Sequence, residues 1–99
     1  MITEAKQQVK DCLRQALAKH QEGQAKIALD LYLKSLAIEK SLPDWVYENT
    51  IILLSQSGQV AQALELQENA LRIHPNSDKI YRALGLAFHC QGNFKNSID

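Results

Sequence analysis

The sequence predicts an all-α fold built from repeated helical hairpins, and three observations support that prediction. Gly23, Gly58 and Gly92 recur at intervals of 35 and 34 residues, each with Gln or Asn as the next residue. The apolar residues between these glycines keep the spacing of amphipathic helices. No strand-like alternation of apolar and polar residues competes with that pattern. The chain therefore reads as two full copies of a two-helix unit and part of a third.

The helices follow from the apolar spacing on either side of each glycine. The first helix is expected to be amphipathic, with helical spacing kept by Val9, Leu13, Ala16 and Leu17. The second helix is expected to bury a row formed by Ile27, Ala28, Leu31 and Leu36. In order along the chain, we expect helices over residues 3–21, 24–40, 44–57, 60–73 and 78–91, and another that begins at Phe94.

The turns and junctions have their own residue signals. Each repeated glycine follows the last apolar residue of a helix, where a left-handed backbone conformation costs little only for glycine. Between copies, Pro43 precedes Asp44, and Pro75 precedes Asn76, Ser77 and Asp78. A proline stops one helix and an oxygen-bearing side chain caps the next, so we expect Asp44 and the residues after Pro75 to be helix caps.

Composition limits the function. The chain has 99 residues, with 11 Lys and Arg against 11 Asp and Glu and a formal net charge of zero. Its size excludes a large multidomain enzyme, and its neutrality argues against nucleic acid or an anionic membrane as partner. No apolar run approaches the ~20 residues of a membrane span. Two cysteines are too few for a disulfide scaffold, so we expect a cytoplasmic protein.

At these residues the chain resembles the tetratricopeptide repeat, a helix-turn-helix unit of about 34 residues. The match is clearest in the second copy and, for the first-helix pattern, in the third, at Tyr81, Leu84, Gly85 and Phe88. The first copy departs from it at Gln15 and Lys19, where the family usually has apolar residues, and Lys40 stands at its proline position. The resemblance implies one domain over residues 1–99, with repeats at 9–43, 44–77 and an incomplete 78–99, stacked as a right-handed superhelix or solenoid of antiparallel hairpins. An unrelated helical bundle is the alternative fold.

The resemblance also assigns packing roles. Leu29, Leu36, Leu64 and Leu71 are expected to hold the helix pairs together, and Tyr47 with Tyr81 to lie in the core. Gly85 is expected to let the paired helix approach closely. The residues at the family's turn and packing positions are Gly23, Ala28, Tyr32, Gly58, Ala63, Ala70, Pro75, Tyr81, Gly85, Phe88 and Gly92.

Stacked repeats of this kind present a concave groove lined by the first helix of each copy, which suits an extended peptide or a partner helix. The resemblance therefore implies a protein-binding module that is not an enzyme. The residues implied to line the groove are Lys10, Leu13, Leu17, His20, Trp45, Glu48, Asn49, Ile52, Ser55, Lys79, Arg82, Leu86 and His89. Trp45 is either a groove anchor or a packing residue at the first junction, and Lys79 with Arg82 could meet a carboxylate.

Some family members clamp the carboxylate at a peptide's C-terminus with several converging side chains. Asn49 and Lys79 match that clamp, whereas Leu13, Leu17 and Ala83 replace its other residues. The match to the clamp is therefore only partial, because capture of a carboxylate needs several donors.

Other classes of site find less support in the sequence. His20 and His89 lie two copies apart, about 20 Å at ~10 Å per packed helix layer, and cannot share a metal. Cys12 and Cys90 are likewise separated and should be free thiols. We expect no cofactor, no metal and no converging acid, base and nucleophile. RNA-binding helical repeats have a similar look over residues 46–66, but the zero net charge disfavours them.

A second functional class stays open. The last predicted helix stops soon after it begins, so Leu84, Phe88 and Ile98 would leave apolar surface uncovered. That surface would suit self-association through the C-terminal edge or attachment to another domain. The chain resembles the N-terminal segments of bacterial chains that join such repeats to a transferase or another catalytic domain, so an accessory segment of a larger enzyme is the alternative function.

Overall fold

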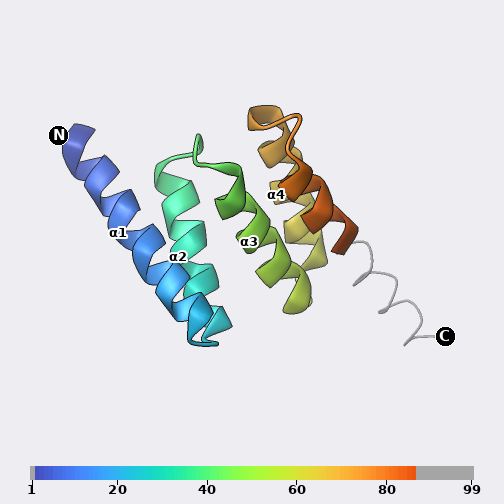
Figure 1. Ribbon diagram of the computed structural model, residues 1–99, viewed down its shortest axis with the longest axis horizontal. Helices are drawn as coiled ribbons and strands as arrows, with labels where there is room; N and C mark the ends of the chain where they lie inside the picture. Colours follow the sequence, from blue (N-terminus) through green and yellow to red (C-terminus); the bar gives the residue numbers. More distant parts are fainter. Residues whose placement is uncertain (1, 87–99) are drawn as a thin grey trace. The chain divides into compact units, whose positions relative to one another are not determined.

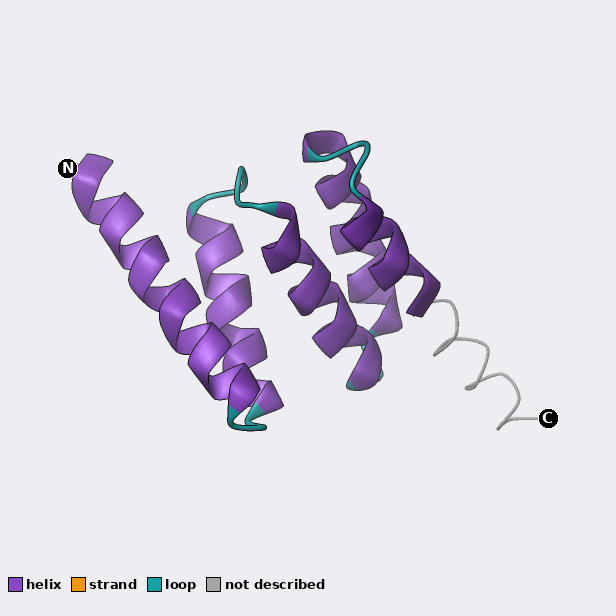
Figure 2. Cartoon of the chain, viewed as in Figure 1, coloured by secondary structure: helices purple, strands orange, loops and turns teal. Residues whose placement is uncertain are grey.

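The computed structural model describes residues 2–86, with side chains from Lys6 onward. Four helices are α1 (Ile2–Gln21), α2 (Ala25–Ile38), α3 (Asp44–Gln56) and α4 (Val60–Ile73). The chain is helical again from residue 78 to residue 86, a segment that we name helix 78–86. Between residues 2 and 86 there are only helices, turns and loops, and no strand (Figure 2). The prediction of an all-α fold is confirmed.

The chain divides into two compact units, one ending at Leu42 and the other beginning at Pro43. In the first unit α1 packs against α2, and in the second α3 packs against α4 (Figure 1). Each pair runs antiparallel and is joined by a short turn. The division falls next to the predicted junction between the first and second repeats. Each helical hairpin is therefore the unit that the glycine spacing predicts.

Both glycine turns have the same hydrogen-bonded form. Gly23 and Gly58 have φ angles of 82° and 85°, in the left-handed region. After α1, the Gly23 amide donates to the His20 carbonyl at 3.1 Å and the Gln24 amide donates to the Lys19 carbonyl at 2.9 Å. This pair of bonds is a Schellman motif, which satisfies carbonyls that the helix end leaves unpaired. The turn after α3 repeats the same pattern around Gly58.

The predicted helix bounds agree with the structure to within two residues at every end that lies between residues 2 and 86. The largest difference at a C-terminus is in α2, which ends at Ile38 and not at Lys40. Glu39 has extended backbone angles, φ −138° and ψ 118°. Its carboxylate accepts hydrogen bonds from the Ser41 amide at 3.2 Å and the Ser41 hydroxyl at 2.7 Å. A local side-chain-to-backbone bond thus competes with the last helical turn.

Only part of the predicted capping is present. The Ser77 hydroxyl accepts a hydrogen bond from the Ile80 amide at 3.3 Å, which is the geometry of an N-cap on helix 78–86. Asp44 was expected to cap its own helix, but α3 has no side-chain cap: Pro43 is at its N-cap position and Asp44 is in its first turn. The Asp44 carboxylate accepts instead from the Ser77 hydroxyl at 2.7 Å. The expectation that Asp44 caps α3 is wrong because Pro43 occupies the N-cap position and Asp44 is the first residue of the helix.

The core of the first hairpin is narrower than predicted. Val9, Ala16, Ala28 and Leu36 are buried as expected. Leu17, which was predicted to line the groove, is exposed, and Ile27, on the predicted apolar face of α2, is 47% exposed. Helix α2 is apolar on most of its circumference, so periodicity alone did not decide which side packs. The buried residues of α2 are Ala28, Leu29, Tyr32, Ser35 and Leu36.

The second unit buries only some of its predicted packing residues, and Leu64 and Leu71 are half-buried. Tyr47 is buried, and Ala63 and Ala70 have no exposed surface. Tyr81 was expected in the core, yet 51% of it is exposed, and its hydroxyl donates to the Pro75 carbonyl at 3.3 Å. Around Gly85 an added Cβ would meet none of the described residues within 4 Å, and the helix expected to approach it begins at Phe94, outside that part of the chain. Phe88, Gly92 and the helix from Phe94 lie outside the described residues.

Candidate functional site

In the second unit, the residues predicted to line the groove come from two helices. On α3, Trp45, Glu48, Asn49 and Ile52 are all partly exposed and follow one another at helical spacing. On helix 78–86, the corresponding residues are Lys79, Arg82 and Leu86, of which Leu86 is half-buried. We call these seven residues the first-helix surface. They combine apolar contact area with charge, which is the make-up of many protein-binding surfaces.

One ion pair joins the two helices of the first-helix surface. Arg82 Nη1 lies 3.8 Å from Glu48 Oε2, with the Arg82 side chain 74% exposed and that of Glu48 14% exposed. The two residues are 34 positions apart, one repeat length. The long contact and the exposed guanidinium make the pair worth at most about 1 kcal/mol. The pair matters more for position than for stability. The mostly buried Glu48 carboxylate holds one side of the Arg82 guanidinium, and the rest of that guanidinium stays exposed to solvent.

A second acid on α3 faces the start of helix 78–86. The hydrogen bond from the Ser77 hydroxyl lowers the pKa of the Asp44 carboxyl, and the positive charges of Lys79 and His74 lower it further. Lys79 and Arg82 are thus each near a carboxylate of α3. A ligand carboxylate would have to share these cations with Asp44 and Glu48.

Ser55 was predicted to line the groove and does not. It is 1% exposed, and its hydroxyl donates to the Ile51 carbonyl at 2.8 Å. A hydroxyl can satisfy itself on the carbonyl one turn earlier and so be buried without another partner. Thr50 and Ser35 do the same, at 2.7 Å to Val46 and 2.9 Å to Leu31. Ser55 is therefore a core residue of the second unit.

In the first unit, the four predicted groove residues share one side of α1. Lys10 and Leu17 are exposed, while Leu13 and His20 are half-buried. The His20 ring meets the Tyr32 ring edge-on, with centroids 6.2 Å apart and an interplanar angle of 84°. His20 is thus partly used in packing α1 on α2, which leaves Lys10, Leu13 and Leu17 as the open part of the row. His89, the corresponding residue of the third copy, lies outside the described residues.

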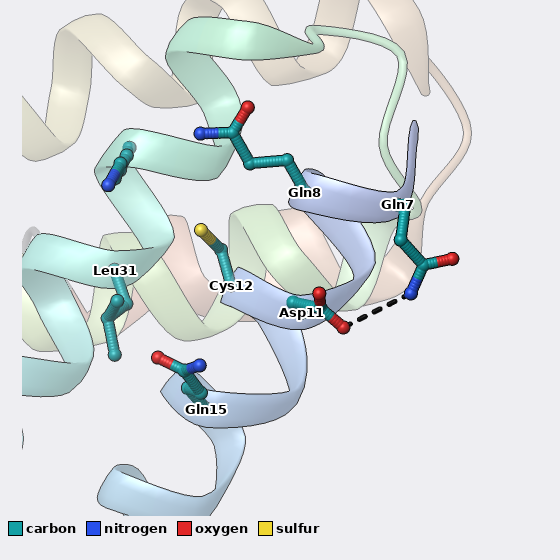
Figure 3. Close-up of a pocket in the computed structure, with 7 residues that line it drawn as sticks. Gln7, Gln8, Asp11, Cys12, Gln15 and Leu31 are labelled. Carbon is teal, nitrogen blue, oxygen red and sulfur yellow. Dashed lines mark hydrogen bonds between the residues drawn. The ribbon is translucent and has the colours of Figure 1, made fainter. Parts of the chain in front are cut away.

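A separate open pocket of about 450 Å³ lies between α1 and α2 (Figure 3). Cys12, a buried free thiol, and Leu31 form its apolar part. Polar side chains surround them, with Asp11 on α1 and Lys34 on α2. Gln7 donates to the Asp11 carboxylate at 3.2 Å. Three glutamines complete the lining, Gln7, Gln8 and Gln15.

Sequence reasoning missed both cross-helix contacts of the second unit, Arg82 with Glu48 and Ser77 with Asp44. The repeat itself held a signal for the first pair, since opposite charges stand at the same position of neighbouring copies. The pocket of the first unit was also missed. Polar Gln15 was noted there only as a departure from the family pattern.

Metal sites and membrane spans are two further features that the described residues could contain. No group of three or more His, Cys, Asp or Glu in that part of the chain could hold a metal ion. None of its helices has both the length and the apolar character needed to cross a membrane.

The comparisons with known proteins add no relative. No family model matches this sequence, and a search of curated proteins gives no match. The resemblance to tetratricopeptide repeats therefore rests on the residues of this chain and stays a prediction.

Proposed function

We propose that this chain is a non-catalytic protein-interaction module of the tetratricopeptide type, which binds a peptide or a partner protein on its first-helix surface. Stacking of its hairpins into a right-handed superhelix, with the α1 row of Lys10, Leu13, Leu17 and His20 continuing the surface, is part of the proposal. The observation that carries it is the pairing of equivalent residues, Glu48 and Arg82, across two successive first helices. A surface that repeats every 34 residues suits an extended ligand, which also repeats its side chains along its length.

The exposed guanidinium indicates the ligand chemistry. Arg82 is anchored at one end by Glu48 and leaves most of its donors open. Arginine binds carboxylates through two parallel hydrogen bonds, and a held side chain loses less entropy on binding. Ile52 and Leu86 are half-buried on the same surface and offer apolar contact. The ligand that fits is a peptide with a carboxylate next to an apolar side chain.

Selection from a random peptide library against the immobilised chain tests this proposal. We expect the selected peptides to share an acidic residue beside an aliphatic or aromatic one. Charge reversal by Lys79→Glu with Arg82→Glu should weaken their binding at least about tenfold, which corresponds to ~1.4 kcal/mol, a size typical of a lost charged contact. The oligomeric state should not change, because these residues do not hold copies of the chain together in this proposal.

The matched control is Arg72→Glu, which reverses an exposed cation on α4, away from the first-helix surface. It should leave peptide binding within about twofold of wild type, since a remote charge acts only through a screened field. Helical circular dichroism must be the same in all variants. Equal weakening by Arg72→Glu, or selected peptides with no shared acidic residue, would contradict the proposal.

An assembly role through the C-terminal edge is the second candidate, and one observation favours it. Tyr81 is half exposed at a position where the repeat pattern predicts burial. Charged substitutions at Phe88 or Ile98 would then lower the mass measured by light scattering. If the chain is an accessory segment of a larger enzyme, the same C-terminal edge would contact the rest of that enzyme.

A further inference from the structure

The first hairpin carries an apolar stripe that the first-helix surface does not use. Along α2, Ile27, Leu31, Lys34 and Ile38 follow at intervals of four, three and four residues, which places them on one side of the helix. Ile27 is 47% exposed and Ile38 is 39% exposed. Leu31 is half-buried and lines the open pocket together with Lys34 (Figure 3). We call these four residues the α2 stripe.

The second hairpin does not carry the same feature. One repeat later, the corresponding residues of α4 are Gln62, Leu66, Asn69 and Ile73. Leu66 and Ile73 are half-buried there, and Gln62, which corresponds to Ile27, is polar. Exposed isoleucines at both ends of the α2 stripe are therefore not a general consequence of the hairpin design. The stripe thus has an exposed isoleucine at each end, with half-buried Leu31 and the Lys34 side chain between them, and exposed apolar surface on one side of a helix is a candidate contact surface.

The α2 stripe is symmetric about the point between Tyr32 and Leu33. Ile27 and Ile38 are equally far from that point along the chain, and so are Leu31 and Lys34. A two-fold interface requires that residue i contact residue j of the other copy while j contacts i. In an antiparallel pair of α2 helices, Ile27 would lie opposite Ile38 of the second copy. Leu31 of one copy would lie opposite the aliphatic part of the Lys34 side chain of the second copy.

The charges beside the stripe have the same self-complementary character. Lys34 and Asp11 line one pocket together with Leu31. A Lys34 stem lying over Leu31 of the other copy brings its ammonium to that copy's pocket, where Gln7 steadies the Asp11 carboxylate. The symmetry then forms two such ion pairs. A surface that carries both an acid and a base can pair both charges with a second copy of itself. A partner that carries only one sign of charge could pair with only one of them.

We propose that this chain forms a two-fold symmetric dimer through antiparallel packing of two α2 stripes. The interface lies on α2 of the first unit and uses neither the first-helix surface nor the α1 row that the proposed function assigns to peptide binding. It is also distinct from the C-terminal edge. One helix stripe and one shallow pocket per copy make a small interface, so the dimer is reversible and depends on concentration.

Sedimentation equilibrium over protein concentrations up to about 0.5 mM tests the dimer, because interfaces below ~1,200 Å² are generally weak. Wild type is expected to move from monomer to dimer mass across that range. Ile27→Glu should raise the dissociation constant at least about tenfold, because it places a carboxylate against an apolar partner. Gln62→Glu, which places the same acid at the equivalent position one repeat later, is the control and should leave the dissociation constant unchanged.

Charge exchange separates this interface from general surface effects. Lys34→Asp should weaken the dimer, since it sets two acids against each other across the interface. Combining it with Asp11→Lys restores the opposite charges and should recover most of the affinity. A merely misfolded variant would not regain dimerisation on a second substitution, and circular dichroism checks that the helices persist.

Cysteine cross-linking tests the antiparallel register. In a Cys12→Ala, Cys90→Ser background, a mixture of Ile27→Cys and Ile38→Cys chains should form a disulfide-linked heterodimer. Ile27→Cys alone should not, because residues 11 positions apart lie about 16 Å apart along a helix. The proposal is overturned if wild type stays monomeric throughout the concentration range. It is overturned equally if Ile27→Glu leaves the dimer intact while Phe88→Glu dissolves it, or if Ile27→Cys links to itself and not to Ile38→Cys.

Discussion

The Ser77 hydroxyl has two roles at the scale of a single residue. It accepts from the Ile80 amide, which caps helix 78–86, and it donates to the Asp44 carboxylate at the start of α3. The two contacts tie together elements whose residues are 33 positions apart. Position and cap are thus set by one side chain, and the placement of Lys79 and Arg82 in the first-helix surface depends on it.

Removal of that hydroxyl should be measurable. Ser77→Ala is expected to lower the free energy of unfolding by about 1 kcal/mol, the usual cost of losing an N-cap, through loss of both contacts. Ser77→Thr keeps a hydroxyl and should cost less than half as much. Urea unfolding followed by circular dichroism measures both. No difference between the Ala and Thr variants would mean that the hydroxyl contributes nothing to stability.

Asp44 makes the stability depend on pH. Its pKa in the folded chain lies below the unfolded value of about 3.9, first because of the Ser77 hydrogen bond. A carboxyl with a lowered folded pKa stabilises the fold above the unfolded pKa, and that contribution disappears as pH falls through the folded pKa. We expect stability to drop between about pH 5 and pH 2. Asp44→Asn should flatten that drop when unfolding is measured at several pH values.

Glu39 requires a separate control for the pH experiment. The hydroxyl and amide of Ser41 lower the pKa of the Glu39 carboxyl, so it too loses a contribution in acid. Glu39→Gln and Asp44→Asn should each remove part of the pH dependence. An unchanged acid transition in Asp44→Asn would show that its carboxylate is not differentially stabilised in the folded chain.

At the scale of the helices and turns, two kinds of glycine behave differently. Gly23 and Gly58 have positive φ angles in Schellman turns, whereas Gly85 lies in helix 78–86 with none of the described residues within 4 Å of its Cβ direction. Gly23→Ala should therefore destabilise the chain by about 1 kcal/mol, because an alanine is strained there. Gly85→Ala should stabilise it by roughly 0.5–1 kcal/mol, because alanine is the better helix former.

Thermal unfolding of Gly23→Ala and Gly85→Ala measures these stability changes, which are expected to have opposite signs. The comparison also decides between two views of Gly85, as a family packing position or as an ordinary helical residue. Destabilisation by Gly85→Ala would indicate a close helix approach at that position and would favour the packing role that the repeat pattern implies.

The helices were predictable because glycine spacing and apolar periodicity agreed along the chain. Which face of each helix is buried was less predictable. In α2, apolar residues surround most of the helix, so the pattern did not separate buried Leu29 from exposed Ile27. Ser55 looked like a polar surface residue, yet its hydroxyl is satisfied inside its own helix. The Asp44 cap prediction was wrong because Pro43 takes the N-cap position, and the contact of the Asp44 carboxylate with Ser77, 33 positions away, is one that local patterns do not contain.

At the scale of the whole molecule, the two proposed surfaces lie in different compact units. The first-helix surface belongs to the unit that begins at Pro43, and the α2 stripe belongs to the unit that ends at Leu42. Substitutions in one should not alter the function of the other. A dimer through the first unit would double the number of peptide sites in one particle, which raises avidity for a ligand that carries two copies of a motif.

The most direct test of the central claim is a nuclear magnetic resonance titration of the isotopically labelled chain with a selected peptide. We predict saturable amide shift changes concentrated on the first-helix surface, around Asn49, Ile52 and Arg82, with the residues of α4 such as Arg72 little affected. Shift changes confined to the α1–α2 pocket, or spread over α4 with none at Ile52 and Arg82, would contradict the account.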